Sequence, residues 1–314
     1  MSLVSNRVSS RGFRRRIANA WTKREKHNSD GVSLPAAAFS ARPARAAVSE
    51  QAIIPRSAGT ELRRTWMKYE RAQQMVGGSK ILRRLTIGIF ARLELLLLRG
   101  HKDRATLNRI RRCRRDAESL LTGNEAFLLY SLAKAQRGLE GAMAELGVYQ
   151  GSSAQIICEA KEDCALYLFD TFSGLPEPGE IETRLLRKGQ FSAGFPAVQR
   201  LLKPYANVRF HPGVFPQSTT GMEGVRFSLV HLDADLYSST LAGLEFFYPR
   251  MVPGGIILTH DYSTLPGVAR AFADFLDEKP EVVIEFPTTQ AMIVLQEPRR
   301  NSHSVDARTR SEMV

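Results

Sequence analysis

The chain has 314 residues, of which 43% are hydrophobic and 24% charged; this is ordinary for a soluble globular protein and long enough for a sizeable core. Its formal net charge of +12 is uneven, because residues 1–115 carry 27 basic and 7 acidic side chains whereas residues 116–295 carry 13 and 22. The three cysteines, Cys113, Cys158 and Cys164, form no C-x-x-C pair and no even set, which excludes a zinc pattern and favours reduced structural cysteines in a cytoplasmic protein.

The N-terminal part predicts a basic arm followed by helices. Residues 30–50 contain too few large apolar side chains to offset the entropy of ordering, so we expect residues 1–55 to be a disordered arm. Residues 56–123 predict a helical region with apolar side chains at three-to-four spacing. Its most apolar stretch, residues 85–100, is interrupted by Arg92 and Glu94, which excludes a membrane span.

Residues 124–296 alternate between predicted helices and predicted strands. This pattern indicates an α/β fold: a Rossmann-like sheet of seven strands, mostly parallel, with helices on both faces and an antiparallel hairpin at its edge. Residues 297–314 predict a flexible tail. The predicted strands cover 141–147, 165–170, 208–213, 227–234, 254–262, 281–287 and 290–296.

The segments that follow the first two strands suggest a cofactor site, since ligands bind beyond the carboxyl ends of strands in such sheets. Glu145, Gly147 and Gly151 follow the first strand, but their spacing misses the dinucleotide G-x-G-x-x-G. Asp170 ends the second strand, where an acid either accepts bonds from ribose hydroxyls or caps the following turn. Together they favour a cofactor that contains a nucleoside.

The remaining strand ends carry further candidates. Phe215, Gln217 and Ser218 follow the third strand and could hold an adenine ring. The fourth and fifth strands should be neighbours, so their terminal side chains should meet; four ionisable groups there are typical of a site for a hard cation. Asp235 would point in the same direction as Asp233 only if the fourth strand continues as far as Asp235. The four groups are Asp233, Asp235, His260 and Asp261.

Five stretches in this order resemble the macrocin O-methyltransferase family, the TylF/MycF type of sugar O-methyltransferases. They are "ELGVYQGSSA", "LYLFDTFSGLPEP", "HPGVFPQST", "HLDADLYSSTLAGLEFFYPRMVPGGIILTHDY" and "PGVARAFADF". The resemblance covers residues 124–296 and implies a class I methyltransferase fold that uses S-adenosylmethionine and a divalent metal, usually Mg²⁺, to methylate a hydroxyl.

The resemblance also implies roles for individual residues. Glu145, Gly147, Gly151 and Ser152 would flank the methionine part of the cofactor, Asp170 the ribose, and Gln217 with Ser218 the adenine. Asp233 and Asp261 would bind the metal. His260 stands where family members commonly have an acid, so it is either the third ligand or a general base.

The expected chemistry is metal-assisted deprotonation of the acceptor hydroxyl, with Asp235 or His260 as the base, or with Asp233 combining both tasks. The acceptor would be a saccharide or a glycosylated metabolite. Two alternatives stay open: methylation of a catechol-like or other small diol, and a non-catalytic Rossmann-like protein whose basic arm binds an anionic partner. No basic patch interleaved with aromatic residues supports specific nucleic-acid recognition, so such binding is not expected, while a homo-oligomer stays open.

Overall fold

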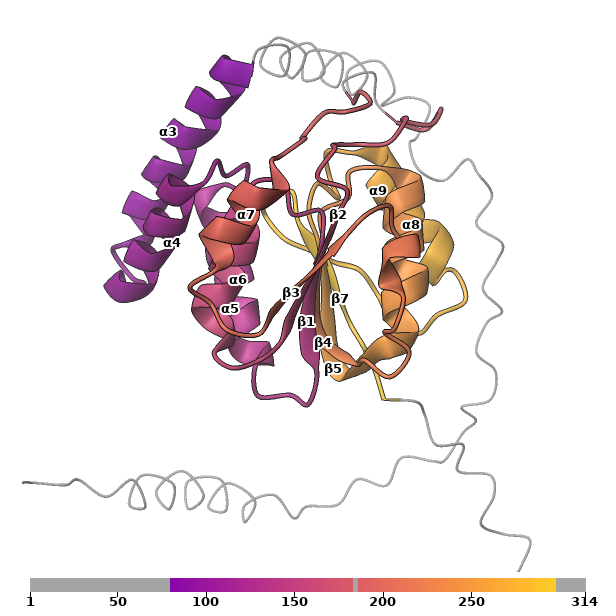
Figure 1. Cartoon of the computed structure of the whole chain (residues 1–314). Coiled ribbons are helices and arrows are strands. Elements are labelled where there is room, and N and C mark those ends of the chain that lie inside the picture. The colour runs from indigo at the N-terminus through magenta and orange to yellow at the C-terminus, as the bar shows by residue number, and fades with distance from the viewer. Residues whose placement is uncertain (1–79, 183–185, 298–314) are drawn as a thin grey trace, which may run out of the picture. The chain divides into compact units, whose positions relative to one another are not determined.

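The computed structural model describes residues 80–182 and 186–297, shown in colour in Figure 1. The predicted basic arm (1–55), residues 56–79 of the predicted helical region and residues 298–314 of the predicted tail lie outside the described residues. Among the helices of the described part, none combines the length and the hydropathy needed to cross a membrane.

The centre of the described part is one sheet. Its strands are β1 (Ala142–Leu146), β2 (Leu166–Asp170), β3 (Val208–Pro212), β4 (Phe227–Leu232), β5 (Met251–Thr259), β6 (Ile284–Glu285) and β7 (Ala291–Val294). They lie in the order β3-β2-β1-β4-β5-β7-β6, with β1 to β5 parallel and β7 antiparallel to both β5 and β6. The predicted seven-stranded, mostly parallel sheet with an antiparallel hairpin at its edge is therefore confirmed.

Several strands end earlier than the sequence predicts. The fifth strand ends at Thr259 instead of reaching Tyr262, so His260 and Asp261 follow it. The fourth strand ends at Leu232 instead of reaching Ala234, so the acids that follow it lie in a turn. The sixth strand contains only Ile284 and Glu285, whose side chains are exposed, because this edge strand has a neighbour on one side only.

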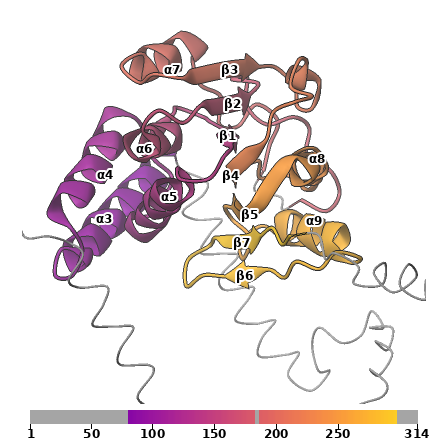
Figure 2. The same cartoon turned by 90° about the horizontal axis from the view of Figure 1, so that it is seen from below.

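The helices cover both faces of the sheet (Figure 2). They are α3 (Lys80–Leu98), α4 (Arg104–Asp116), α5 (Gly123–Gln136), α6 (Ser152–Lys161), α7 (Phe195–Leu202), α8 (Tyr237–Phe247) and α9 (Pro266–Leu276). The core on one face is shared with α5, α6 and α7, and the core on the other with α8 and α9. The first two described helices form an outer layer, with α3 against α5 and α4 against α6.

The start of α5 is fixed by a capping box. The Thr122 hydroxyl accepts a hydrogen bond from the Glu125 amide, and the Glu125 carboxylate accepts one from the Thr122 amide. These bonds satisfy two donors that a helix start would otherwise leave unpaired. They also fix the position of the Glu125 side chain, which matters for the site described below.

Alternation along the strands assigns each side chain to one face. Met143 of β1 and Leu229 of β4 lie in the core shared with α5 and α6, and their neighbours Ala144 and Val230 lie in the opposite core. Continuing the same alternation puts Glu145 and His231 on the α5 and α6 side. A buried polar pair therefore directly precedes the end of the sheet where β1 and β4 finish.

The cysteines form no disulfide. Burial raises the pKa of both Cys113 and Cys158 to about 12, so neither thiol ionises readily near neutral pH. This agrees with the expectation that they are reduced structural residues.

Candidate functional site

A cavity of about 470 Å³ opens at the carboxyl ends of the central strands. Its volume lies in the range of small-molecule sites. A larger cavity of about 820 Å³ borders α3 and α4 and contains none of the predicted site residues. The smaller cavity is lined by seven of them, namely Gly147, Asp170, Phe215, Asp233, Asp235, His260 and Asp261.

The turn after β1 has an unusual backbone that brings two strand ends together. Gly147 has a φ of 92°, and a Cβ on this residue would lie 1.9 Å from the carbonyl oxygen of Asp233. Tyr149 and Gly151 also have positive φ values, and Gly151 is the N-cap of α6. The turn thus needs glycine where its backbone meets the end of β4.

Asp170 holds this turn in place. Its Oδ2 accepts hydrogen bonds from the amides of Val148 (2.7 Å) and Tyr149 (2.8 Å), and its Oδ1 accepts one from the amide of Phe172 (2.7 Å). A carboxylate has about four acceptor positions, so one is left for a ligand. Ribose binding stays a prediction, and the geometry adds a second role in which Asp170 positions the turn.

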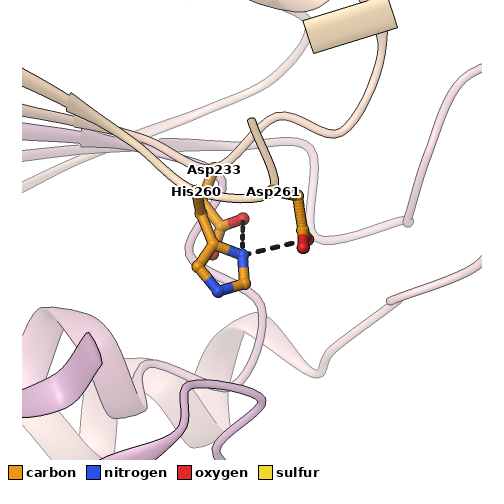
Figure 3. A group of neighbouring side chains, drawn as sticks. All are labelled: Asp233, His260 and Asp261. Carbon is orange, nitrogen blue, oxygen red and sulfur yellow. Dashed lines mark ion pairs between the residues drawn. The ribbon is translucent and has the colours of Figure 1, made fainter. Parts of the chain in front are cut away.

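Asp233, His260 and Asp261 form one cluster at the ends of β4 and β5 (Figure 3). Each offers one possible ligand atom, and these atoms lie within 4.8 Å of one another. His260 Nδ1 is 3.0 Å from Asp261 Oδ2 and 3.3 Å from Asp233 Oδ1. Figure 3 shows this nitrogen facing both carboxylates while the second ring nitrogen points away from them.

Backbone hydrogen bonds between strand ends position this cluster. The Asp233 amide donates to the carbonyl of Leu146 (2.8 Å), and the His260 amide donates to the carbonyl of Leu232 (2.9 Å). Asp261 has a φ of 56°, and its Oδ1 accepts a hydrogen bond from the Thr264 hydroxyl (2.7 Å). A left-handed residue at this position is strained, and such strain concentrates at functional sites.

Charge within the cluster shifts its pKa values. Burial lowers the pKa of His260, but the carboxylates of Asp261 and Asp233 raise it more, and the net result is a pKa well above the ordinary histidine value. Burial raises the pKa of Asp233, whereas the neighbouring His260 lowers it, and the net direction is down. The lowered pKa of Asp233 therefore favours its ionised form beside His260.

The cluster fits a divalent cation. Both ring nitrogens of His260 are buried, and neither forms a hydrogen bond of good geometry within the described residues. Nδ1 lies between two carboxylate oxygens, which is the arrangement expected of three ligands around a shared ion. A buried nitrogen without a partner is costly unless a ligand satisfies it.

Asp235 lies in the turn after β4. Since the strand ends at Leu232, Asp235 does not continue its alternation, and it has a φ of 59°. Its side chain nevertheless belongs to the cavity lining. The turn, instead of the strand, brings Asp235 to the site.

Other predicted residues lie away from the cavity lining. Glu145 is fully buried with its Oε1 2.8 Å from Nδ1 of His231, and burial raises its pKa despite that partner. Ser152 begins α6, and its buried hydroxyl has no hydrogen bond within the described residues. Gln217 and Ser218 lie on a short 3₁₀ turn (Gln217–Thr219). The cavity is lined instead by the preceding residues Gly213, Val214 and Phe215. The cofactor roles of these residues, and of Gly151, stay predictions.

The sequence did not reveal Glu125, whose carboxylate Oε2 lies 3.5 Å from Nε2 of His260. Its Oε1 accepts hydrogen bonds from the amide (3.2 Å) and hydroxyl (2.8 Å) of Thr289. The only available signal was the T-x-x-E capping box at Thr122, and such a motif predicts a helix start. The motif does not indicate that this helix start lies near the end of β5.

Comparisons with known proteins find similarity to O-methyltransferases. A family model described as macrocin O-methyltransferase (TylF) matches residues 131–285. The 8-demethyl-8-(2,3-dimethoxy-alpha-L-rhamnosyl)-tetracenomycin-C 4'-O-methyltransferase of Streptomyces olivaceus is 32% identical over 142 residues, which are 40% of this chain and 54% of that protein. The mycinamicin III 3''-O-methyltransferase of Micromonospora griseorubida is 28% identical over 158 residues, which are 45% of this chain and 62% of that protein.

The chain therefore matches only 54% and 62% of the lengths of these curated relatives. Among solved structures, the O-methyltransferase NovP aligns with a TM-score of 0.51 and 20% sequence identity, covering 57% of this chain and 82% of that one. A likeness at this identity shows the fold alone.

Proposed function

We propose that this chain is an S-adenosylmethionine-dependent O-methyltransferase that methylates a hydroxyl of a sugar or glycosylated small molecule, because a family model described as macrocin O-methyltransferase (TylF) matches residues 131–285. The main observation behind this proposal is the convergence of Asp233, His260 and Asp261 on a cavity that Gly147 and Asp170 also line. Cofactor, cation and acceptor would share that cavity.

In this proposal the cofactor lies across the ends of β1 and β2. The turn at Gly147 would face the methionine part, since its backbone borders the cavity. Asp170 would accept a ribose hydroxyl with its remaining acceptor position. Phe215 would offer a ring face to the adenine, because it lines the cavity while Gln217 and Ser218 do not.

The first prediction concerns Asp170→Asn. The substitution removes the charge that holds three amides and places an NH₂ group near them, so we expect affinity for S-adenosylmethionine to fall by about 10- to 100-fold. Isothermal titration calorimetry measures this directly. The control is Asp163→Asn, an equal loss of charge at an exposed position after α6, which should leave the affinity unchanged. An unchanged affinity in Asp170→Asn would reject the role of Asp170.

The chain's own residues would perform the proton transfer that methylation requires. When bound by Asp233, His260 and Asp261, a divalent cation would lower the pKa of an acceptor hydroxyl. Asp235 lines the same cavity and would accept the proton. The end of β4 would hold the acceptor oxygen in line with the methyl group, because the Asp233 amide is tied to β1.

The second prediction tests metal dependence. Removing divalent cations with a chelator should lower the rate of methyl transfer at least 100-fold, since a Lewis acid contributes several kcal/mol to such a step. Adding Mg²⁺ or Mn²⁺ should restore the rate. Binding of S-adenosylmethionine, followed by calorimetry in the same chelator, should persist. Full activity in chelator would contradict the proposed role of the cluster.

The acceptor class can be tested with labelled cofactor. Transfer of a radioactive methyl group from S-adenosylmethionine is expected to glycosides and nucleotide-linked sugars, and not to their aglycones. The relative from Streptomyces olivaceus is named for 4'-O-methylation of a rhamnosyl-tetracenomycin. Transfer to catechols instead of sugars would favour the alternative acceptor class.

A further inference from the structure

Glu125 lies behind His260, on the side away from the two aspartates. Its Oε2 is 3.5 Å from His260 Nε2, while His260 Nδ1 faces Asp233 and Asp261. The imidazole ring thus lies between one carboxylate at the start of α5 and two at the ends of β4 and β5. Figure 3 shows that the second ring nitrogen of His260 points away from the aspartates. This nitrogen is Nε2, which faces Glu125.

The Glu125 carboxylate has little freedom to move. It is 1% exposed, Oε2 accepts the Thr122 amide at 2.7 Å, and Oε1 accepts the amide and hydroxyl of Thr289 at 3.2 and 2.8 Å. Donors from two separate segments therefore fix both oxygens. An acceptor held this firmly can select one orientation and one tautomer of a neighbouring histidine.

The choice of tautomer decides what His260 can bind. If Nε2 carries the proton and donates it towards Glu125, Nδ1 keeps its lone pair and directs it between Asp233 and Asp261. Histidines that bind metals in proteins usually donate their second ring N–H to a carboxylate or carbonyl in this way. The alternative tautomer would aim an N–H at the position where a cation binds.

We propose that Glu125 is a positioning residue that fixes His260 as an Nδ1 ligand, so that the centre prefers a divalent transition ion such as Mn²⁺ or Co²⁺ over Mg²⁺. Transition ions such as Mn²⁺ and Co²⁺ accept an imidazole nitrogen more readily than Mg²⁺ does, because Mg²⁺ is a hard cation that prefers oxygen ligands. This inference rests on the proposed function, because it uses the same cluster.

The first experiment measures binding of the metal alone, without acceptor. Titration calorimetry with Mn²⁺ and Mg²⁺ should show at least tenfold tighter binding of Mn²⁺ to the wild type. Glu125→Gln should weaken Mn²⁺ binding by about 10- to 100-fold, the usual effect of losing the carboxylate behind a ligating histidine. Thr289→Val removes one hydrogen bond to Glu125 but keeps its charge, so it should change Mn²⁺ affinity less than threefold.

The second experiment separates positioning from a merely structural effect. In a His260→Asp background there is no imidazole to orient, so Glu125→Gln should no longer weaken Mn²⁺ binding, and the preference for Mn²⁺ over Mg²⁺ should disappear. Equal losses in both backgrounds would overturn the proposal. So would unchanged Mn²⁺ affinity of Glu125→Gln in the His260 background.

A direct measurement needs no substitution at Glu125, which also caps α5. In wild-type protein labelled with ¹⁵N-histidine, long-range ¹H–¹⁵N spectra should show His260 with its proton on Nε2 when diamagnetic Zn²⁺ is bound, with the signal assigned by its absence in His260→Asp. A proton on Nδ1 would overturn the proposal. Methyl transfer is assayed separately, so failure of the enzymatic function and failure of this metal preference give different results.

Discussion

Asp233→Asn is expected to slow methyl transfer roughly a thousandfold, which corresponds to about 4 kcal/mol of transition-state stabilisation. The substitution keeps the size of the side chain and the amide that donates to Leu146, but removes the negative charge beside His260. The cluster would then hold one carboxylate and one imidazole, which bind a divalent cation and polarise an acceptor hydroxyl far less well.

Three measurements distinguish this effect from unfolding. The affinity for S-adenosylmethionine, measured by calorimetry, should stay within about threefold, because the proposed cofactor contacts lie on β1 and β2. Mn²⁺ affinity should fall in the same variant. Asp277→Asn, at the exposed C-cap of α9, removes an equal charge and should leave the rate unchanged. Near wild-type turnover by Asp233→Asn would reject Asp233 as a metal ligand.

The position of Asp233 at the edge of the sheet could be predicted from the sequence for two reasons. Apolar runs of five or six residues alternating with helical segments define parallel strands, and parallel strands bring their carboxyl ends to one edge. The order of strands then makes β4 and β5 neighbours, so residues 28 positions apart in sequence, such as Asp233 and Asp261, meet in one cluster. No side-chain contact had to be known in advance.

The buried contact between Glu145 and His231 could not be predicted from the sequence pattern. Its position beside the turn suggested contact with a cofactor, yet the alternation of β1 turns it towards α5 and α6, where it pairs with His231 across the strand pair. Burial of a carboxylate is expensive, and His231 offsets only part of this cost, because burial still raises the pKa of Glu145. Both residues are visible in the sequence, but only the register of β1 against β4 places Glu145 opposite His231.

The position of Glu125 beside His260 could not be predicted from the sequence for a different reason. It lies 135 residues before His260 in the chain, and what brings the two together is the packing of α5 on the sheet. A capping-box motif predicts a helix start, but the direction in which that start faces depends on how the helix packs against its neighbours. Residues that act through another side chain are thus the part of a site least visible in one sequence.

The backbone at Gly147 leads to the second large expected effect. Gly147→Ala should lower the free energy of unfolding by about 2–5 kcal/mol and abolish most activity. Its φ of 92° costs an alanine about 1–2 kcal/mol, and relieving a Cβ only 1.9 Å from the Asp233 carbonyl oxygen costs about 1–3 kcal/mol more. The movement that relieves this clash must displace Asp233, so stability and the metal cluster should be lost together.

Gly221→Ala is the matched control for this substitution. Gly221 has a φ of 82°, but a Cβ there meets nothing within 4 Å, and the residue lies outside the cavity lining. Denaturant unfolding should therefore show a loss of only about 1–2 kcal/mol, with Mn²⁺ binding intact. The difference between the two variants isolates the contact between Gly147 and Asp233. Equal losses of stability in both variants would mean that the turn at Gly147 adjusts without moving the end of β4. The close contact between Gly147 and Asp233 would then not hold Asp233 in place.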